Sequence, residues 1–271
     1  MYKFPRGIHF SAARDWTPMA DALASQRPDH KPGTACGYHA VTIAWLVGEL
    51  IRRVDGRPID RFVAEELATP LGADGLFVAL PRDAHDRVAS GHAPSSNSPK
   101  PTATRSRNGG RLANVARQPI RRALRRQIRA FYTPGIGRMM FDPEYREIPV
   151  PSANGHFTAR SLAAMYSMLA NDGRLPDGSR LIDASVIDEA TTVQTRKLDR
   201  IIGLPMHWRI GYHRVGRGRA FGHFGMGGSG GWASRRQRLA VAYVHNGDPM
   251  SLRGQVRMVG INRAVAASLS R

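Results

Sequence analysis

A glycine-rich stretch late in the chain, GGSGG at residues 227–231, is the first place where side-chain chemistry could occur. It matches the G-x-S-x-G nucleophile elbow of α/β-hydrolases, which sets its serine between a strand and a helix. Beyond Ser229 the only acid is Asp248 and the only histidine is His245, the reverse of the order that the elbow's partners follow. The residues that come next, LAVAYV, have the pattern of a strand. We therefore reject the elbow and predict a tight glycine hairpin.

A lone cysteine, Cys36, stands close to His39, and a thiol beside a histidine can act as a nucleophile. No acid or amide is placed to orient that histidine, so we interpret Cys36 as a small hydrophobic residue next to a buried helix. A single cysteine also excludes an intrachain disulfide and a cysteine metal cage. Three other histidines lack the spacing of metal ligands (His207, His213 and His223), and we expect no cofactor and no metal.

The third candidate for chemistry is a set of separated sequence blocks that occur in a fixed order. The first runs from Pro32 to Gly72, PGTACGYHAVTIAWLVGELIRRVDGRPIDRFVAEELATPLG, and the second from Glu147 to Ile182. The third comprises HWRIGYHR and then FGHFGMGGSGGWA with LAVAYVHN. Together they resemble the carboxylesterases and lipases related to class C β-lactamases, a branch of the penicillin-recognising serine hydrolases. The resemblance covers most of residues 28–80 and 147–247.

This resemblance implies roles for four residues. Tyr38 matches the tyrosine of the family's Tyr-x-Asn motif, whose phenol relays protons beside the nucleophile. The family lowers the pKa of that phenol with a nearby lysine. His223-Phe224-Gly225 stands where β-lactamases have Lys-Thr-Gly, so His223 would point into the cleft. The main-chain N–H just after Gly225, that of Met226, would be one of two oxyanion-hole donors. Ala40 replaces the amide of Tyr-x-Asn, which argues against β-lactam recognition.

The family's nucleophile, the serine of a Ser-x-x-Lys motif on a helix upstream of the tyrosine, has no counterpart here. None of the four lysines has a serine three residues before it (Lys3, Lys31, Lys100 and Lys197). The resemblance therefore implies an esterase of small acyl esters, acting through an acyl-enzyme, that lacks the N-terminal part of its fold and is inactive as this chain. A non-catalytic relative that binds a peptide or a cell-wall fragment is the alternative.

The positioning elements follow from periodicity. HAVTIAWLVGELIRRV, at 39–54, is apolar on nearly all faces and predicts a buried helix that Asp55-Gly56 ends. Residues 1–37 have the character of irregular chain. Thr158 is the expected cap of a helix over 159–172. Four strands are expected from the period of two (207–214, 218–225, 230–234 and 239–246), and then a helix with Leu252, Val256, Val259 and Leu269 facing inward.

Helices followed by strands and a closing helix favour an α+β fold. The resemblance implies that this fold is an antiparallel sheet flanked by helices, the β-lactamase/penicillin-binding-protein-like transpeptidase fold. We expect one partial β-lactamase-related domain over 1–271, with a basic Pro/Ser/Gly-rich insert at about 82–140. A sheet without its N-terminal partner strands leaves an edge open, so we expect the chain to self-associate or to be marginally stable.

The formal net charge is +19, and twelve of the basic residues lie between Arg87 and Phe141, where there is no acid. Within the insert, 120–132 has the pattern of an arginine-covered surface helix. Contact with an acidic surface or a membrane stays open as an alternative. The absence of aromatic residues from 87 to 130 argues against nucleic acid. With no signal peptide and no apolar run that could span a bilayer, we expect a soluble, cytoplasmic protein that takes a small-molecule ester.

Overall fold

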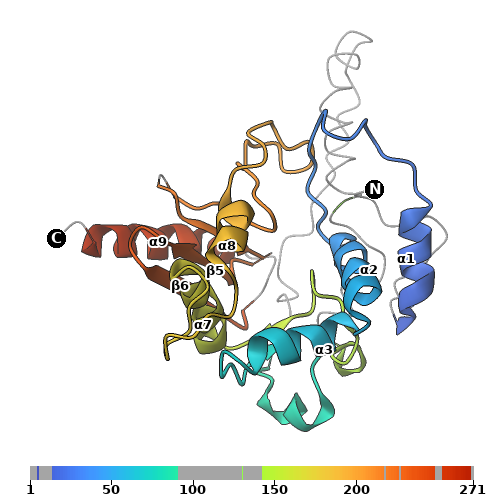
Figure 1. Ribbon diagram of the computed structural model, residues 1–271, viewed down its shortest axis with the longest axis horizontal. Coiled ribbons are helices and arrows are strands. Elements are labelled where there is room, and N and C mark those ends of the chain that lie inside the picture. The colour runs from blue at the N-terminus through green and yellow to red at the C-terminus, as the bar shows by residue number, and fades with distance from the viewer. Residues whose placement is uncertain are drawn as a thin grey trace, which may run out of the picture.

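The computed structural model of the protein describes residues 5, 14–90, 130, 142–216, 218–225, 227–247 and 252–269 (Figure 1). Its helices are α1 (Trp16–Ala24), α2 (Ile43–Asp55), α3 (Ile59–Val63), which continues as the π-helical turn Ala64–Ala68, α7 (Ala159–Ala170), α8 (Ala184–Thr191) and α9 (Leu252–Ser268). Short 3₁₀ turns span Arg82–Arg87 and Pro143–Tyr145. The strands are β1 (Leu76–Phe77), β2 (His156–Phe157), β3 (His213–Arg214), β4 (Phe221–Phe224), β5 (Gly230–Ser234) and β6 (Leu239–Tyr243).

The main sheet has the order β3-β4-β5-β6, and every neighbouring pair is antiparallel. Its register places His223 opposite Gly231, and Gly231 opposite Ala242. A small second sheet joins β1 to β2. Helices packed on an antiparallel sheet make this an α+β fold, as the sequence predicts.

Helix α7 packs on one face of the main sheet and α9 on the other. Phe221 and Ala233 face α7 and share a buried cluster with its Tyr166. On the other face, Trp232 packs with Met258 of α9. Thr158 caps α7 as predicted, because its side-chain oxygen accepts a hydrogen bond from the Ser161 N–H at 3.1 Å. The sheet that carries His223 is therefore packed between α7 and α9.

A second core joins α1 to α2, where Met19, Leu23 and Trp45 are fully buried. The prediction that residues 1–37 are irregular is wrong over α1. The apolar side chains at 19 and 23 share one helical face and cover Trp45, and this tertiary burial outweighs the weak local signal of a nine-residue helix.

Helix α2 begins four residues later than predicted, and it is not buried on all sides. Ala44, Trp45 and Gly48 are buried. An apolar stripe on another face is exposed, comprising Ile43, Val47, Leu50 and Val54. The apolar residues of this helix therefore form two groups. One group is buried in the core, and the other is exposed along a separate face.

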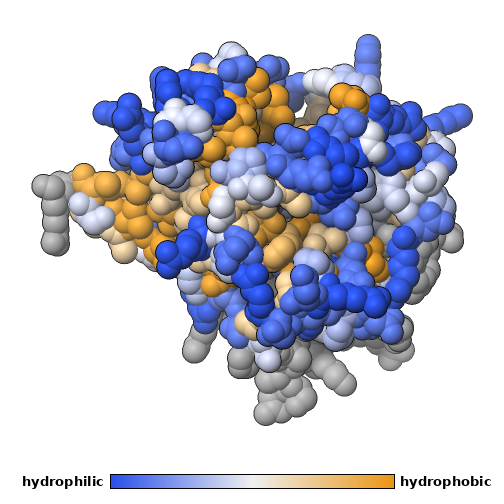
Figure 2. Space-filling view, turned by 60° about the horizontal axis from the view of Figure 1, so that its bottom comes forward, coloured by the Kyte–Doolittle hydropathy of each residue, from blue (hydrophilic) through white to orange (hydrophobic). Residues whose placement is uncertain are grey.

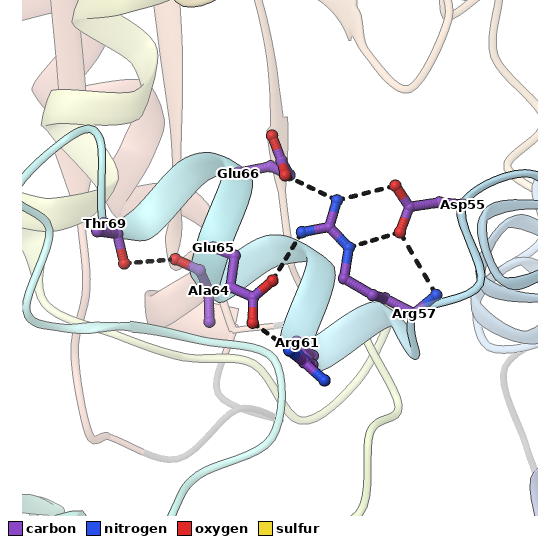
Figure 3. Close-up of polar contacts among 7 residues, drawn as sticks. All are labelled: Asp55, Arg57, Arg61, Ala64, Glu65, Glu66 and Thr69. Atoms are coloured by element: carbon purple, nitrogen blue, oxygen red, sulfur yellow. Dashed lines mark hydrogen bonds and ion pairs between the residues drawn. The ribbon is translucent and has the colours of Figure 1, made fainter.

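The turn after α2 is stabilised by charge (Figure 3). Gly56 ends the helix in a left-handed conformation (φ 89°), as predicted. The Arg57 guanidinium then reaches three carboxylates, those of Asp55 at 2.6 Å, Glu65 at 2.7 Å and Glu66 at 2.7 Å. These contacts fix α3 and the π-helical turn against the end of α2.

Two further expectations need correction. The strand predicted over 207–214 is limited to β3, because His207 (φ 52°) and Gly211 (φ 79°) adopt left-handed conformations that interrupt an extended chain. Val259 in α9 and Leu269 just after it are 49% and 47% exposed, and Met258 faces the core in their place. Apolar side chains accordingly gather at the surface over α9 (Figure 2). The side chains of Leu252 and Val256 lie outside the described residues.

Most of the basic insert also lies outside the described residues, including the helix predicted over 120–132 apart from Ala130, so these expectations stay predictions. Residues 82–90 are described and begin with the 3₁₀ turn at Arg82–Arg87.

Candidate active site

A cavity of about 460 Å³ lies between the main sheet, α7 and the segment that leads into α2. The leading segment contributes Tyr38, α7 contributes Leu162 and Tyr166, and β4 contributes His223. This is where residues from distant parts of the chain meet. A larger cavity of about 790 Å³ adjoins it and shares Gly155, Phe157 and His245 with it.

Tyr38 and His223, two of the four predicted site residues, are in direct contact in the wall of this cavity. The Tyr38 hydroxyl lies 3.1 Å from His223 Nε2, a hydrogen bond that joins residues 185 positions apart. The two rings also stack, with centroids 5.8 Å apart. Sequence similarity placed both residues in one cleft, and the fold brings them within hydrogen-bonding distance.

The protonation of this pair follows from burial. Burial, and then the neighbouring His213, lowers the pKa of His223 to about 4. Burial, and then the charge of Asp199, raises the pKa of Tyr38. At neutral pH the imidazole is therefore neutral and the phenol is protonated. The phenol donates to Nε2 when the imidazole proton sits on Nδ1. The pKa of Tyr38 is raised, whereas a tyrosine that accepts a proton needs a lowered pKa. Tyr38 could therefore act as a general base only with an added cation nearby.

The other two predicted residues follow β4. The Gly225 N–H donates to the Ser229 carbonyl at 2.8 Å, which closes the turn. Gly225 lines the cavity. Met226 lies outside the described residues, so its predicted oxyanion-hole N–H stays a prediction.

The glycine stretch forms the hairpin turn between β4 and β5, in agreement with rejection of the nucleophile elbow. Ser229 lines the cavity, but His245 does not activate it. His245 Nε2 donates to the Gly227 carbonyl at 2.7 Å, and its Nδ1 accepts from the Gly247 N–H at 3.0 Å. Both ring nitrogens are occupied, and only the His245 main-chain N–H reaches the Ser229 hydroxyl.

Cys36 does not form a nucleophile with His39. Its thiol points to the carbonyls of Lys197 and Leu198, and His39 Nδ1 contacts the Thr42 hydroxyl instead. Burial, and then Asp199, raises the pKa of the thiol, which disfavours the reactive thiolate.

Three residues that sequence reasoning did not assign to the site support the pair. The Tyr166 hydroxyl accepts a hydrogen bond from the His223 N–H at 3.2 Å. Asp199 contacts the Tyr38 main chain, and the Trp208 ring stacks on Tyr38. The helical period places Tyr166 inward, which is a usable signal. Asp199 lies in irregular chain and carries no such signal, and the period of two that predicted a strand over 207–214 did not point to a role for Trp208.

Comparison with known proteins identifies the family of this chain. The β-lactamase family matches residues 1–261, and the chain belongs to that family. The esterase/beta-lactamase LipL of Mycobacterium tuberculosis is 32% identical over 264 residues, which are 94% of this chain and 59% of LipL.

Two solved structures have the same fold. A family VIII carboxylesterase superposes with a TM-score of 0.73 at 31% identity, over 90% of this chain and 62% of its own. A penicillin-binding protein homolog from Caulobacter crescentus superposes with a TM-score of 0.71 at 32% identity, over 91% of this chain and 62% of its own. The chain thus spans about three fifths of the length of these relatives. The β-lactamase/penicillin-binding-protein-like fold and the relation to esterases are therefore established.

The described residues contain neither a candidate metal site nor a candidate membrane-spanning helix. No group of three or more histidine, cysteine, aspartate or glutamate side chains there could hold a metal ion. None of the helices described is both long and apolar enough to cross a bilayer.

Proposed function

We propose that this chain provides the tyrosine–histidine side of a serine hydrolase site that cleaves small acyl esters through an acyl-enzyme. The observation that carries the proposal is the 3.1 Å contact between the Tyr38 hydroxyl and His223 Nε2 in the wall of a cavity. The identity to LipL and to the carboxylesterase supports the ester class of substrate.

In the proposed reaction, a serine hydroxyl attacks the ester carbonyl and, as the new C–O bond forms, gives its proton to the Tyr38 phenolate, which the cation of an added serine–lysine segment would stabilise. The tetrahedral intermediate then breaks its bond to the alkoxy group, which takes up a proton and leaves as an alcohol. Tyr38 supplies that proton, the one it took from the serine, and water then hydrolyses the acyl-enzyme through the same relay, which releases the acid and restores the serine. His223, neutral at pH 7, orients the phenol through their hydrogen bond.

The nucleophile is the part that these 271 residues do not contain, since no serine stands three residues before a lysine. We propose that the chain alone does not hydrolyse esters. A serine–lysine segment seated in the cavity would add both the nucleophile and the cation that lowers the pKa of Tyr38. The adjoining cavities of about 460 and 790 Å³ offer room for such a segment beside a small acyl group.

The test has two arms. The chain alone is treated with a fluorophosphonate probe, and we expect no labelled serine. The second arm fuses the chain behind an N-terminal segment of the family VIII carboxylesterase that carries the Ser-x-x-Lys motif expected of this family. We expect this fusion to hydrolyse p-nitrophenyl butyrate and to be labelled at the serine of its Ser-x-x-Lys.

In the fusion, Tyr38→Phe should lower kcat by about 10²–10⁴-fold, the usual range for loss of a proton-transfer group. The matched control is Tyr243→Phe, because Tyr243 lies on β6 and does not line the smaller cavity. A labelled serine in the chain alone, or full activity of the Tyr38→Phe fusion, contradicts the proposal.

A second candidate function is binding without catalysis, favoured by a cavity that persists in a sequence with no Ser-x-x-Lys. It predicts that a muropeptide binds to the chain alone and protects Tyr38 from nitration. Isothermal titration calorimetry with the muropeptide checks this, and Tyr38→Phe, the variant that removes the phenol from the cavity wall, should weaken the binding.

A further inference from the structure

The segment 195–208 lies along the segment that leads to Tyr38. The Arg200 N–H donates to the Cys36 carbonyl at 3.0 Å, and Cys36 pairs with Asp199 in a parallel bridge. The Lys197 ammonium donates to the carbonyl of Gly33 at 2.9 Å. The position of Tyr38 is therefore set by a partner more than 150 residues further along the chain.

Asp199 is the centre of this contact and is fully buried (0% exposed). Its Oδ1 accepts hydrogen bonds from three main-chain N–H groups, those of Tyr38 at 3.2 Å, Ile201 at 2.8 Å and Ile202 at 2.9 Å. Its Oδ2 accepts from the indole N–H of Trp208 at 2.8 Å. Burying a carboxylate is costly unless hydrogen bonds compensate, so these four donors make the position specific for an acid.

The indole that Asp199 holds lies flat on the tyrosine. The rings of Trp208 and Tyr38 are parallel within 2°, with centroids 5.5 Å apart. Trp208 also meets the edge of His213, whose ring in turn contacts His223 at 5.6 Å between centroids. One carboxylate thus restrains Tyr38 from two sides, through its main chain and through the ring stacked on its phenol.

We propose that Asp199 is a positioning residue that holds the Tyr38 phenol against His223, with the indole of Trp208 as its second contact. The inference rests on the proposed function in so far as that function gives the Tyr38–His223 pair its role. Asp199 itself does not line the cavity and would not touch a substrate.

Asp199→Asn tests the role, because the amide oxygen can keep the three main-chain donors while the amide NH₂ faces the indole N–H of Trp208. Two donors cannot bond each other, so the indole should leave the phenol and water should reach His223. We expect the His223 imidazole, followed by NMR in the chain as it stands, to titrate about one pH unit or more above the wild-type value. The near-ultraviolet circular dichroism of the stacked rings should fall.

Trp208→Phe keeps a ring next to the phenol but removes the donor to Asp199, so we expect a smaller shift in the same direction. If Asp199→Asn does not fold, Trp208→Phe decides the question. The control is Asp74→Asn, an exposed acid that pairs with Arg87, which should leave the His223 titration unchanged. An unchanged titration in the folded variants, or an equal shift in the control, overturns the positioning role. None of these readouts requires ester hydrolysis, so an inactive fusion protein overturns only the proposed function.

Discussion

Tyr38 and His223 are a pair in which burial favours the neutral form of both partners. The pKa of one rises and the pKa of the other falls to about 4, so the hydrogen bond between them persists over a wide pH range. Proton transfer from the phenol to this imidazole is unfavourable, because the pKa of the phenol lies far above that of the imidazole. The pair can therefore hold and donate a proton at neutral pH, and only an added positive charge would convert Tyr38 into a base.

The low pKa of His223 should make stability depend on pH. An unfolded histidine binds a proton near pH 6.5 and the folded one only near pH 4, so the unfolded state binds more protons between these values. The contribution is fully present above pH 6.5 and is lost as the pH falls towards 4. We expect His223→Gln to reduce the loss of unfolding free energy between pH 7 and pH 5 by about 2 kcal/mol.

Urea unfolding at the two pH values measures this effect. Val186→Gln, an exposed and non-titrating position on α8 that does not line either cavity, is the control and should keep the pH dependence of the wild type. An undiminished pH dependence in His223→Gln would show that other buried histidines account for it.

At the scale of elements, the hairpin of β4 and β5 depends on the absence of side chains where α7 crosses the sheet. A Cβ added at Gly231 would lie 2.5 Å from Tyr166 Cε2 and 2.9 Å from the Val241 carbonyl oxygen. Tyr166 is the residue whose hydroxyl accepts from the His223 N–H, so crowding at Gly231 reaches the site through α7.

Gly231→Ala should therefore destabilise the chain by about 1–3 kcal/mol, the usual cost of overpacking a core. Gly260→Ala in α9 is the matched control, because its new methyl group meets no atom within 4 Å. Alanine is the better helix former, so we expect this variant to be more stable by up to about 1 kcal/mol. Thermal melts of both variants make the comparison. Equal stability of the two would mean that α7 moves away from the sheet without cost.

At the scale of the molecule, the exposed apolar stripe of α2 is the feature that most affects behaviour in solution. Ile43, Val47, Leu50 and Val54 are 40%, 46%, 62% and 82% exposed and recur at helical spacing along one face. A contiguous apolar face favours association, whereas single exposed apolar residues are ordinary.

We expect the chain to self-associate through this stripe, and Leu50→Glu combined with Val54→Glu to shift it towards the monomer. Sedimentation velocity over a range of concentrations measures the change. Val186→Glu, on α8, alters one comparably exposed apolar residue outside the stripe and should leave association unchanged. Association that persists in the double variant would locate the contact elsewhere, for instance at the apolar surface over α9.

The sequence by itself determined the features that depend on near neighbours. The period of two marks β4, β5 and β6, Thr158 and the period of 3.6 mark α7, and Gly56 marks the end of α2. Similarity to a family added Tyr38 and His223 as residues of one cleft. The predictions of strands, of the helix cap and of the helix end succeed because turn chemistry, capping and amphipathic spacing act over a few residues.

The tertiary structure alone decided which apolar residues are buried and what holds the site. It showed α1 covering Trp45, the exposed face of α2 and the outward side chains of α9. It also showed Asp199 fixing both Tyr38 and Trp208. Local patterns cannot reveal such contacts, because they join residues separated by long stretches of chain and exist only after the segments have packed.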